Sequence, residues 1–186
     1  TSGTRLRVRF FGGEEMDTLD VDDPALVSQA YERGVPMGGD LIGAGDSAPS
    51  FLVWAMRDPL AAPLQRVQVV KGWIEAGTTH EMVYDVACSD GLAVDPETHR
   101  CPDNGATVDL DTCGLSDDAG ASELRTLWAD PDFDADERAF YYVRALENPT
   151  CRWSTWDALR AGVEPRLDVD ATIQERAWSS PIWYTP

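Results

Sequence analysis

The stretch Arg5–Gly13, RLRVRFFGG, decides the fold class of this 186-residue chain, because its polar and apolar side chains alternate. Arginines at every second position separate Leu6, Val8 and Phe10, and two glycines close the run. A period of two is typical of a β-strand that buries one face and exposes the other. The stretch therefore predicts a strand over Arg5–Phe11, followed by a turn.

Similar short runs, rich in β-branched and aromatic residues, continue along the chain and are separated by polar turns. The other strands are expected at Ser50–Met56, Arg66–Trp73, Glu81–Cys88, Ala139–Leu146 and Arg176–Tyr184, with weaker candidates at Val108–Thr112 and Leu124–Trp128. Short strands of this composition favour a mainly β fold, an antiparallel immunoglobulin-like β-sandwich.

Two short helices and one long loop complete the expected fold. The helix Asp23–Arg33 has its own aspartate as possible N-cap, a proline at the first helical position and a glycine after its end. The helix Ser154–Ala161 begins at Ser154 or Thr155 as N-cap and stops before a glycine. The Gly-, Pro- and Asp-rich stretch Ser89–Ala121 reads as a loop that carries cysteines.

The charge of the chain is strongly acidic: 33 Asp and Glu against 15 Lys and Arg give a formal net charge of −18. Such a surface repels phosphate backbones and anionic lipid, so neither nucleic acid nor a membrane surface is an expected partner. No apolar run approaches the length of a membrane span. The length and the aromatic content suffice for one domain with its own core over residues 1–186.

The four cysteines, Cys88, Cys101, Cys113 and Cys151, lie 13, 12 and 38 residues apart, without a CxxC pair or zinc-finger spacing. We expect at least one disulfide, which places the protein outside the cytoplasm, in the periplasm or the extracellular space. Cys101–Cys113 is the favoured pair because it closes a short loop, and the other two cysteines are then possible partners. Four buried thiols are the alternative.

Acidic residues recur at every second position in Asp130–Glu137, as they do in a calcium-binding loop. An EF-hand needs Gly at its sixth position and Glu at its twelfth, where this chain has Ala135 and Tyr141. The EF-hand is therefore excluded, and an irregular calcium site or a solvated acidic turn remain. Asp95–Asp111 offers the same two alternatives. The two histidines, at positions 80 and 99, are expected at the surface.

The motif GAGDSA, the first residue and the aromatic residues near the end of the chain each suggest a possible chemical role. GAGDSA, Gly43–Ala48, has the outline of a dinucleotide fingerprint, but a strand-like run follows it where a helix is required, so we predict a turn. Thr1 would be a nucleophile if its own amine served as base, as in N-terminal-threonine hydrolases. The aromatic residues Trp178, Trp183 and Tyr184 are expected to fill a core or an interface rather than to form a sugar platform.

A series of long motifs covers almost the whole chain. They are GVPMGGDL (Gly34–Leu41), APSFLVWAMRDP (Ala48–Pro59), RVQVVKGW (Arg66–Trp73), VYDVACSDG (Val83–Gly91), THRCPDNGATVDLDTC (Thr98–Cys113), FYYVRALENPTCRWSTWDA (Phe140–Ala158) and QERAWSSPIWY (Gln174–Tyr184). In this order they resemble the C-terminal third of a bacterial family of proteins of unknown function, numbered thirty-six-oh-four.

That family in turn resembles the PHP superfamily of metal-dependent hydrolases. The resemblance implies an N-terminal barrel, as a domain or a separate chain, whose His and acidic residues bind divalent metal ions. It implies attack of a metal-activated hydroxide on a small phosphoester or related ester. The barrel ligands have no counterpart here, so this chain is expected to hold no metal and to be inactive alone. Thr1 would then mark a cut or truncation behind the barrel.

The resemblance also suggests site residues. The loop with Gly38, Gly39 and Asp40 would approach the barrel mouth, where the glycines admit substrate and Asp40 binds a metal or orients the substrate. Ser2 and Arg5 would contact an oxyanion or a phosphate. A tight turn with a solvated Asp40, and an Arg5 that only begins a strand, are the structural alternatives.

Three functions follow from this sequence. The first is the C-terminal portion or subunit of a metal-dependent hydrolase, in which this chain walls the active site of the barrel. The second is a non-catalytic exported β-sandwich that binds a ligand or partner through its aromatic residues. The third is an N-terminal-threonine hydrolase.

Overall fold

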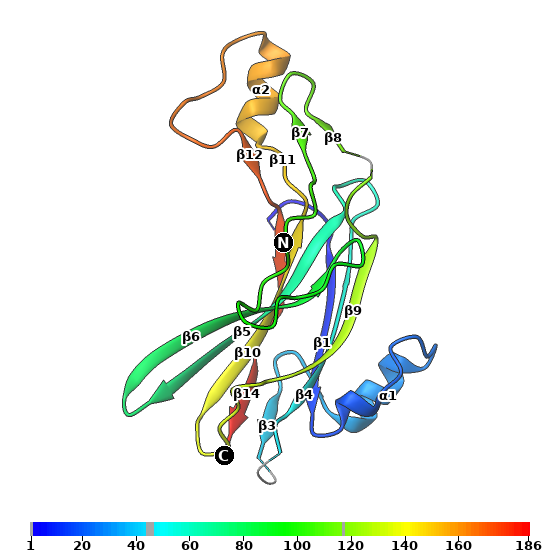
Figure 1. Cartoon of the computed structure of the whole chain (residues 1–186), viewed down its shortest axis with the longest axis vertical. Coiled ribbons are helices and arrows are strands. Elements are labelled where there is room, and N and C mark those ends of the chain that lie inside the picture. The colour runs from blue at the N-terminus through cyan, green and yellow to red at the C-terminus, as the bar shows by residue number, and fades with distance from the viewer. Residues whose placement is uncertain (1, 44–46, 117) are drawn as a thin grey trace.

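The structure is a computed structural model that describes residues 2–43, 47–116 and 118–186. Two β-sheets pack face to face in an elongated molecule (Figure 1). The smaller sheet has the strand order β2-β1-β4-β9, formed by Val35–Pro36, Arg7–Gly13, Ser50–Met56 and Glu123–Ala129. The mainly β sandwich predicted from the sequence is therefore confirmed.

The larger sheet has the order β3-β14-β10-β5-β6, and β13 also pairs with β10. Its strands are Asp40–Ile42, Ile182–Thr185, Ala139–Glu147, Leu64–Glu75, Thr78–Cys88 and, for β13, Arg176–Trp178. Neighbouring strands run antiparallel, except that β14 and β3 run parallel. The long hairpin β5–β6 extends beyond the rest of the sheet (Figure 1).

The first strand, β1, buries side chains on both of its faces rather than on one. Phe10 points into the core between the sheets, where it stacks on Phe51 with ring centroids 5.4 Å apart. Phe11 points the other way, into a second apolar cluster. Helix α1, Leu26–Arg33, and the 3-10 helix η1, Met16–Thr18, cover that outer face of the smaller sheet.

A smaller lobe lies at one end of the sandwich, at the top of Figure 1. It contains helix α2, Trp153–Ala161, and two short two-stranded sheets formed by β7, β8, β11 and β12, which are Val108–Asp109, Gly114–Leu115, Thr150–Cys151 and Thr172–Ile173. A disulfide between Cys113 and Cys151 joins these two sheets. A second disulfide, Cys88–Cys101, holds the loop after β6.

The expected disulfide bonding is confirmed, but the favoured pair Cys101–Cys113 is wrong. Loop length alone favoured that pair. In the structure each of these two cysteines lies beside a different partner, because Cys101 returns along the edge of the larger sheet while Cys113 lies in the end lobe.

Several predicted boundaries also differ. The strand predicted over Arg176–Tyr184 is two strands. Between them, the Ser179 hydroxyl rather than a backbone carbonyl accepts the Val143 N–H, and Pro181 has no N–H to donate. Helix α2 begins one residue before Ser154, so neither proposed cap residue is the N-cap. The hydroxyl of Thr155 instead donates to the carbonyl of Ala171 at 2.7 Å.

At the start of helix α1, Asp23 lies outside the helix. Its carboxylate accepts hydrogen bonds from the Ala25 N–H and from the Gln29 side chain. The weak strand candidate Val108–Thr112 shortens to two residues. No helix in the described part of the chain is long and apolar enough to cross a membrane.

Candidate functional site

The N-terminal residues proposed for the site attach the chain to the sandwich. The Ser2 hydroxyl donates to the carboxylate of Glu175 and accepts the Arg176 N–H at 2.8 Å. The backbone N–H of Arg5 donates to Asp58 at 3.0 Å. Both Ser2 and Arg5 are exposed. Thr1 lies outside the described residues, as do positions 44–46 of the GAGDSA motif.

The two glycines of PMGGDL form the tight turn by which the chain passes from the smaller to the larger sheet. Gly38 has φ +90°, and its N–H donates to the carbonyl of Pro181. A Cβ at Gly39 would lie 2.9 Å from the Cβ of Val35. This geometry supports the structural interpretation of both glycines, while Asp40, directly after the turn, is exposed.

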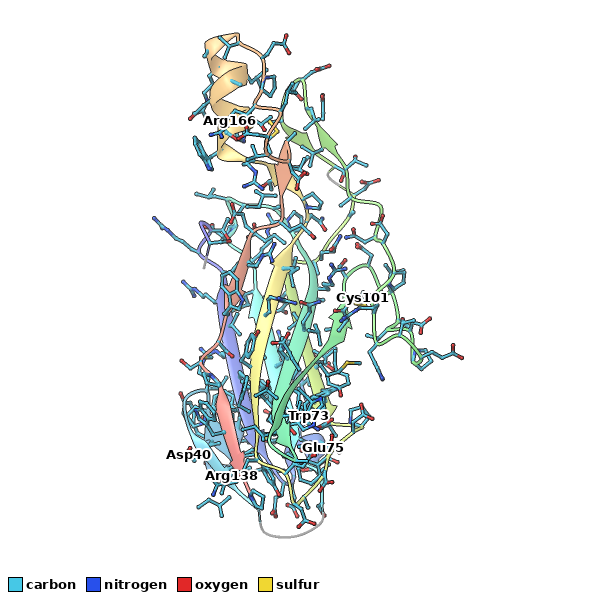
Figure 2. The ribbon with its side chains drawn as sticks, turned by 90° about the vertical axis from the view of Figure 1, so that its left-hand side faces the viewer. Asp40, Trp73, Glu75, Cys101, Arg138 and Arg166 are labelled. Carbon is cyan, nitrogen blue, oxygen red and sulfur yellow. A yellow bond between two sulfur atoms is a disulfide. The ribbon has the colours of Figure 1, made fainter. Side chains whose placement is uncertain are left out.

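The structure does not bring the two proposed groups together. Ser2 contacts Arg176, which pairs with Leu146 of β10, whereas Asp40 pairs with Trp183, which pairs with β10 six residues earlier. At 3.3 Å per residue the two places are about 20 Å apart. Figure 2 accordingly shows Asp40 near the end of the sandwich opposite the lobe that carries Arg166.

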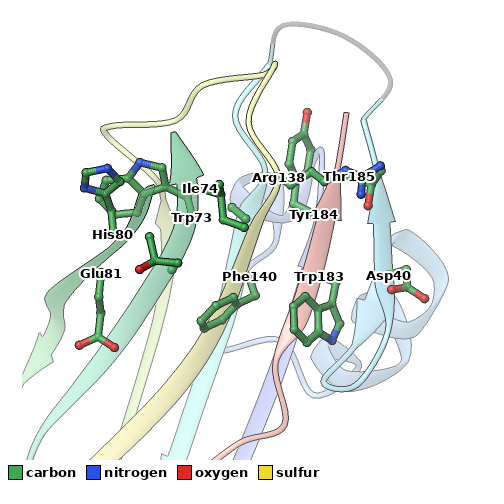
Figure 3. A pocket seen from close by; sticks show the side chains of 13 residues that line it. Asp40, Trp73, Ile74, His80, Glu81, Arg138, Phe140, Trp183, Tyr184 and Thr185 are labelled. Carbon is green, nitrogen blue, oxygen red and sulfur yellow. The ribbon is translucent and has the colours of Figure 1, made fainter. Parts of the chain in front are cut away.

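A groove of about 720 Å³ lies at Asp40, on the larger sheet (Figure 3). Its lining comes from β3, β5, β6, β10 and β14 and from the residue before β10: Asp40, Gly72, Trp73, Ile74, Thr79, His80, Glu81, Arg138, Ala139, Phe140, Trp183, Tyr184 and Thr185. This volume is within the range of about 300–1,000 Å³ that is usual for small-ligand pockets. We call it the sheet groove.

One row of paired residues runs straight across the floor of the sheet groove. Glu81 pairs with Gly72, Gly72 with Phe140, Phe140 with Trp183, and Trp183 with Asp40. Directly paired residues point to the same face of a sheet, so the row presents two aromatic rings between two carboxylates (Figure 3). With strands about 4.8 Å apart, the row is about 19 Å long.

Gly72, which has no side chain, leaves the space that the Phe140 ring occupies. A Cβ at Gly72 would lie 2.3 Å from the ring, so any side chain there displaces Phe140. The next ring in the row, Trp183, lies 5.4 Å from Phe140 at an interplanar angle of 55° and is 50% exposed. Tyr184 is buried in the core, as expected, whereas Trp183 and Trp178 are half-exposed and fill no core, so for these two the expected interface role stays a prediction.

A stacked pair of rings lies on the opposite face of the hairpin from this row, toward the core between the sheets. Trp73 and His80 face each other across the β5–β6 hairpin, with centroids 5.2 Å apart and planes 19° apart. The Nε2 atom of His80 lies 3.6 Å from the Glu75 carboxylate. His80 is therefore partly exposed, as expected, and is held between an aromatic ring and an acidic side chain.

A buried ionic cluster lies behind the groove, between the two sheets. Lys71, the only lysine of the chain, is 2.7 Å from Asp130, and its ammonium also donates to the carbonyl of Asp132. The hydroxyls of Tyr141 and Tyr84 donate to Asp130 and Asp132. Burial, together with these carboxylates, raises the pKa of both tyrosines.

This cluster corrects one interpretation of the acidic stretch Asp130–Glu137. Asp130 is neither solvated nor a calcium ligand, because Lys71 and Tyr141 share one of its oxygens and the Asp132 N–H donates to the other. The rest of the stretch forms turns in which the carboxylates of Asp130 and Asp134 accept backbone N–H groups two residues on. Among the described residues, no group of three or more His, Cys, Asp or Glu side chains converges to hold a metal ion. The residues described here therefore do not fit a divalent metal.

One buried carboxylate stands apart from these networks. Glu147, at the last position of β10, is fully buried, and neither of its oxygens has a hydrogen-bond partner in the described structure. Burial raises its pKa to about 7; the nearby Thr4 hydroxyl lowers the pKa, and the charges of Glu175 and Asp58 raise it further.

Most residues of the sheet groove were not predicted from the sequence. A glycine inside the apolar run VVKGW was one available signal, since glycine in a strand marks a place that other atoms approach closely. The sole lysine beside that glycine was a second signal, for the buried cluster. The row of paired residues had no signal in the sequence, because strand pairing brings together residues from five separate strands.

Comparison with known proteins gives one result. The family model for DUF3604, described as a protein of unknown function, matches residues 1–186. No curated protein and no solved structure matches the chain. The long motifs thus led to the correct family.

Proposed function

The chain belongs to the DUF3604 family of proteins of unknown function, and from this premise we propose that its β-sandwich is the ligand-binding wall of a metal-dependent ester hydrolase. In this proposal the divalent metal ions and the reacting groups belong to a PHP-like barrel domain or chain. The substrate is a small phosphoester or related ester. The sandwich binds the part of the substrate that lies away from the ester.

The sheet groove is the observation that carries the proposal. It combines exposed aromatic surface with carboxylates at the two ends of its floor, which is the composition of a binding surface. The described residues offer no converging set of metal ligands, so the reaction itself is assigned to the barrel. Asp40, at one end of the row, then positions the ligand rather than binding metal.

The test compares two proteins: this 186-residue chain and the longest natural polypeptide that contains it. We expect only the longer polypeptide to hydrolyse bis(p-nitrophenyl) phosphate with Mn²⁺, and a natural substrate to show a KM about tenfold higher after Trp183→Ala, with kcat little changed. Trp153→Ala, on α2 in the end lobe, is the matched control because Trp153 is also exposed. Robust hydrolysis by the 186 residues alone would contradict the proposal.

The second candidate is a non-catalytic exported binding module, favoured by the half-exposed Trp183 and by the two disulfides. A longer polypeptide that binds a ligand in the sheet groove but hydrolyses no ester under any metal would select this candidate. The third function, an N-terminal-threonine hydrolase, depends on Thr1 and stays a prediction.

A further inference from the structure

The row across the sheet groove has the chemistry of a carbohydrate platform. We propose that a short, neutral oligosaccharide lies across the strands over Phe140 and Trp183, with its hydroxyl groups bound by Asp40 and Glu81. The inference rests on the proposed function, because it names the part of the substrate that the groove holds. It extends that function to a ligand class.

The aromatic part of the argument is geometric. The axial C–H groups of a pyranose ring form a flat apolar face, which packs against an exposed aromatic ring. Trp183 offers such a ring at half exposure, and Phe140 continues the surface toward Gly72. The Phe140 ring lies over Gly72, and it meets the Trp183 ring at 55°, so the two rings form a continuous but angled apolar surface between the two carboxylates.

The polar part of the argument is the match of donors and acceptors. Asp40 and Glu81, at opposite ends of the row, accept hydrogen bonds from hydroxyl groups, and charge-assisted bonds of this kind are the stronger ones. Arg138 lines the same groove and supplies donors that a sugar oxygen accepts. A polyol satisfies both kinds of group at once.

The charge of the groove selects among ligand classes. Two carboxylates on the floor of a chain with net charge −18 disfavour an anionic ligand. A quaternary ammonium would suit the carboxylates and rings, but it leaves the donors of Arg138 unused. The row, about 19 Å long, exceeds one sugar ring, so an oligosaccharide fits it better than a monosaccharide.

The experiment is isothermal titration calorimetry of the 186-residue chain, whose two sheets enclose their own core. The probes are maltohexaose, cellohexaose, xylohexaose and mannohexaose, with choline chloride as the cationic comparison. We expect at least one hexaose to bind with a Kd of about 1 mM or tighter. Trp183→Ala should weaken that binding about tenfold or more, and Trp153→Ala should leave it unchanged.

Asp40→Asn provides a second variant, because Asp40 is exposed and its substitution leaves the core intact. It should weaken the same hexaose about threefold to tenfold, through the loss of a charge-assisted acceptor. Absence of binding by all four hexaoses, equal binding by Trp183→Ala, or binding of choline alone would overturn the inference. If the inference fails while Trp183→Ala still raises KM in the longer polypeptide, the proposed function stands and only the ligand class is wrong.

Discussion

Glu147→Gln should stabilise the sandwich, and the gain should depend on pH. The wild-type carboxyl is fully buried, and the nearby Thr4 hydroxyl offsets only part of the cost of burial, so ionisation there is unfavourable. Its pKa is about 7 in the folded chain and 4.5 as the reference value for the unfolded chain. Gln has nearly the same shape and never ionises.

The sign and size of the effect follow from proton binding. Below pH 4.5 the carboxyl of Glu147 is protonated in both states, and the variant gains nothing. Between pH 4.5 and about 7 the unfolded chain releases the proton while the folded chain keeps it, so wild-type stability falls as pH rises. Above pH 7 the cost is constant, at most about 3 kcal/mol. Water that enters around the ionised carboxylate lowers this cost, and we expect the variant to gain about 2 kcal/mol in the free energy of unfolding.

The assay is urea denaturation of wild-type and variant at pH 4 and pH 8, with thermal melts alongside. At pH 8 the variant should gain about 2 kcal/mol in the free energy of unfolding, or about 4–8 °C in Tm, and at pH 4 almost nothing. Glu14→Gln is the control, because Glu14 is exposed and should show no such pH dependence. A gain that is equal at both pH values, or absent at pH 8, would refute the burial argument for Glu147.

Three further predictions test the core and the groove. Lys71→Ala leaves Asp130 buried without its cation and should cost about 3–5 kcal/mol in urea denaturation; a loss under 1 kcal/mol would contradict the role of the buried pair. Replacing Cys113 and Cys151 by serine removes the disulfide that spans 38 residues and should cost about 4 kcal/mol, measured as a lower Tm. Gly72→Ala should displace Phe140, cost about 1–3 kcal/mol and weaken hexaose binding, whereas unchanged binding would remove the ring from the platform.

The strands of the sandwich were predictable because their signals are local. Ser50–Met56 has the bounds predicted for it, and the strands around Arg66–Trp73 and Ala139–Leu146 differ from their predictions only at the ends. In each case a run of β-branched and aromatic residues packs on the core, so composition and position agree.

The disulfide pairing and the helix start were not predictable, because distant segments decide them. Cys113 meets Cys151 only after the end lobe has formed, although Cys101 is nearer along the chain. Helix α2 starts at Trp153 because the backbone of Arg152 bonds to Ala171, from a segment beyond the helix.

The candidate site was only partly predictable for the same reason. Asp40 was singled out from its motif, and it does line the groove, but Ser2 lies about 20 Å away and Arg5 bonds to Asp58 outside the groove. Phe140, Trp183 and the remaining members of the row come together through pairings among five strands. A pairing shift of one residue would turn each of these side chains to the other face.

The response of the tryptophan indole N–H signals to ligand shows directly whether the sheet groove is the ligand-binding surface. The chain has 7 tryptophans, so a ¹H–¹⁵N spectrum resolves a small set of indole signals that single Trp variants assign. During titration with the tightest hexaose, the signal of Trp183 should move and that of Trp153 should not. If the Trp183 signal stays in place while a hexaose binds elsewhere, the sheet groove is not the ligand-binding surface.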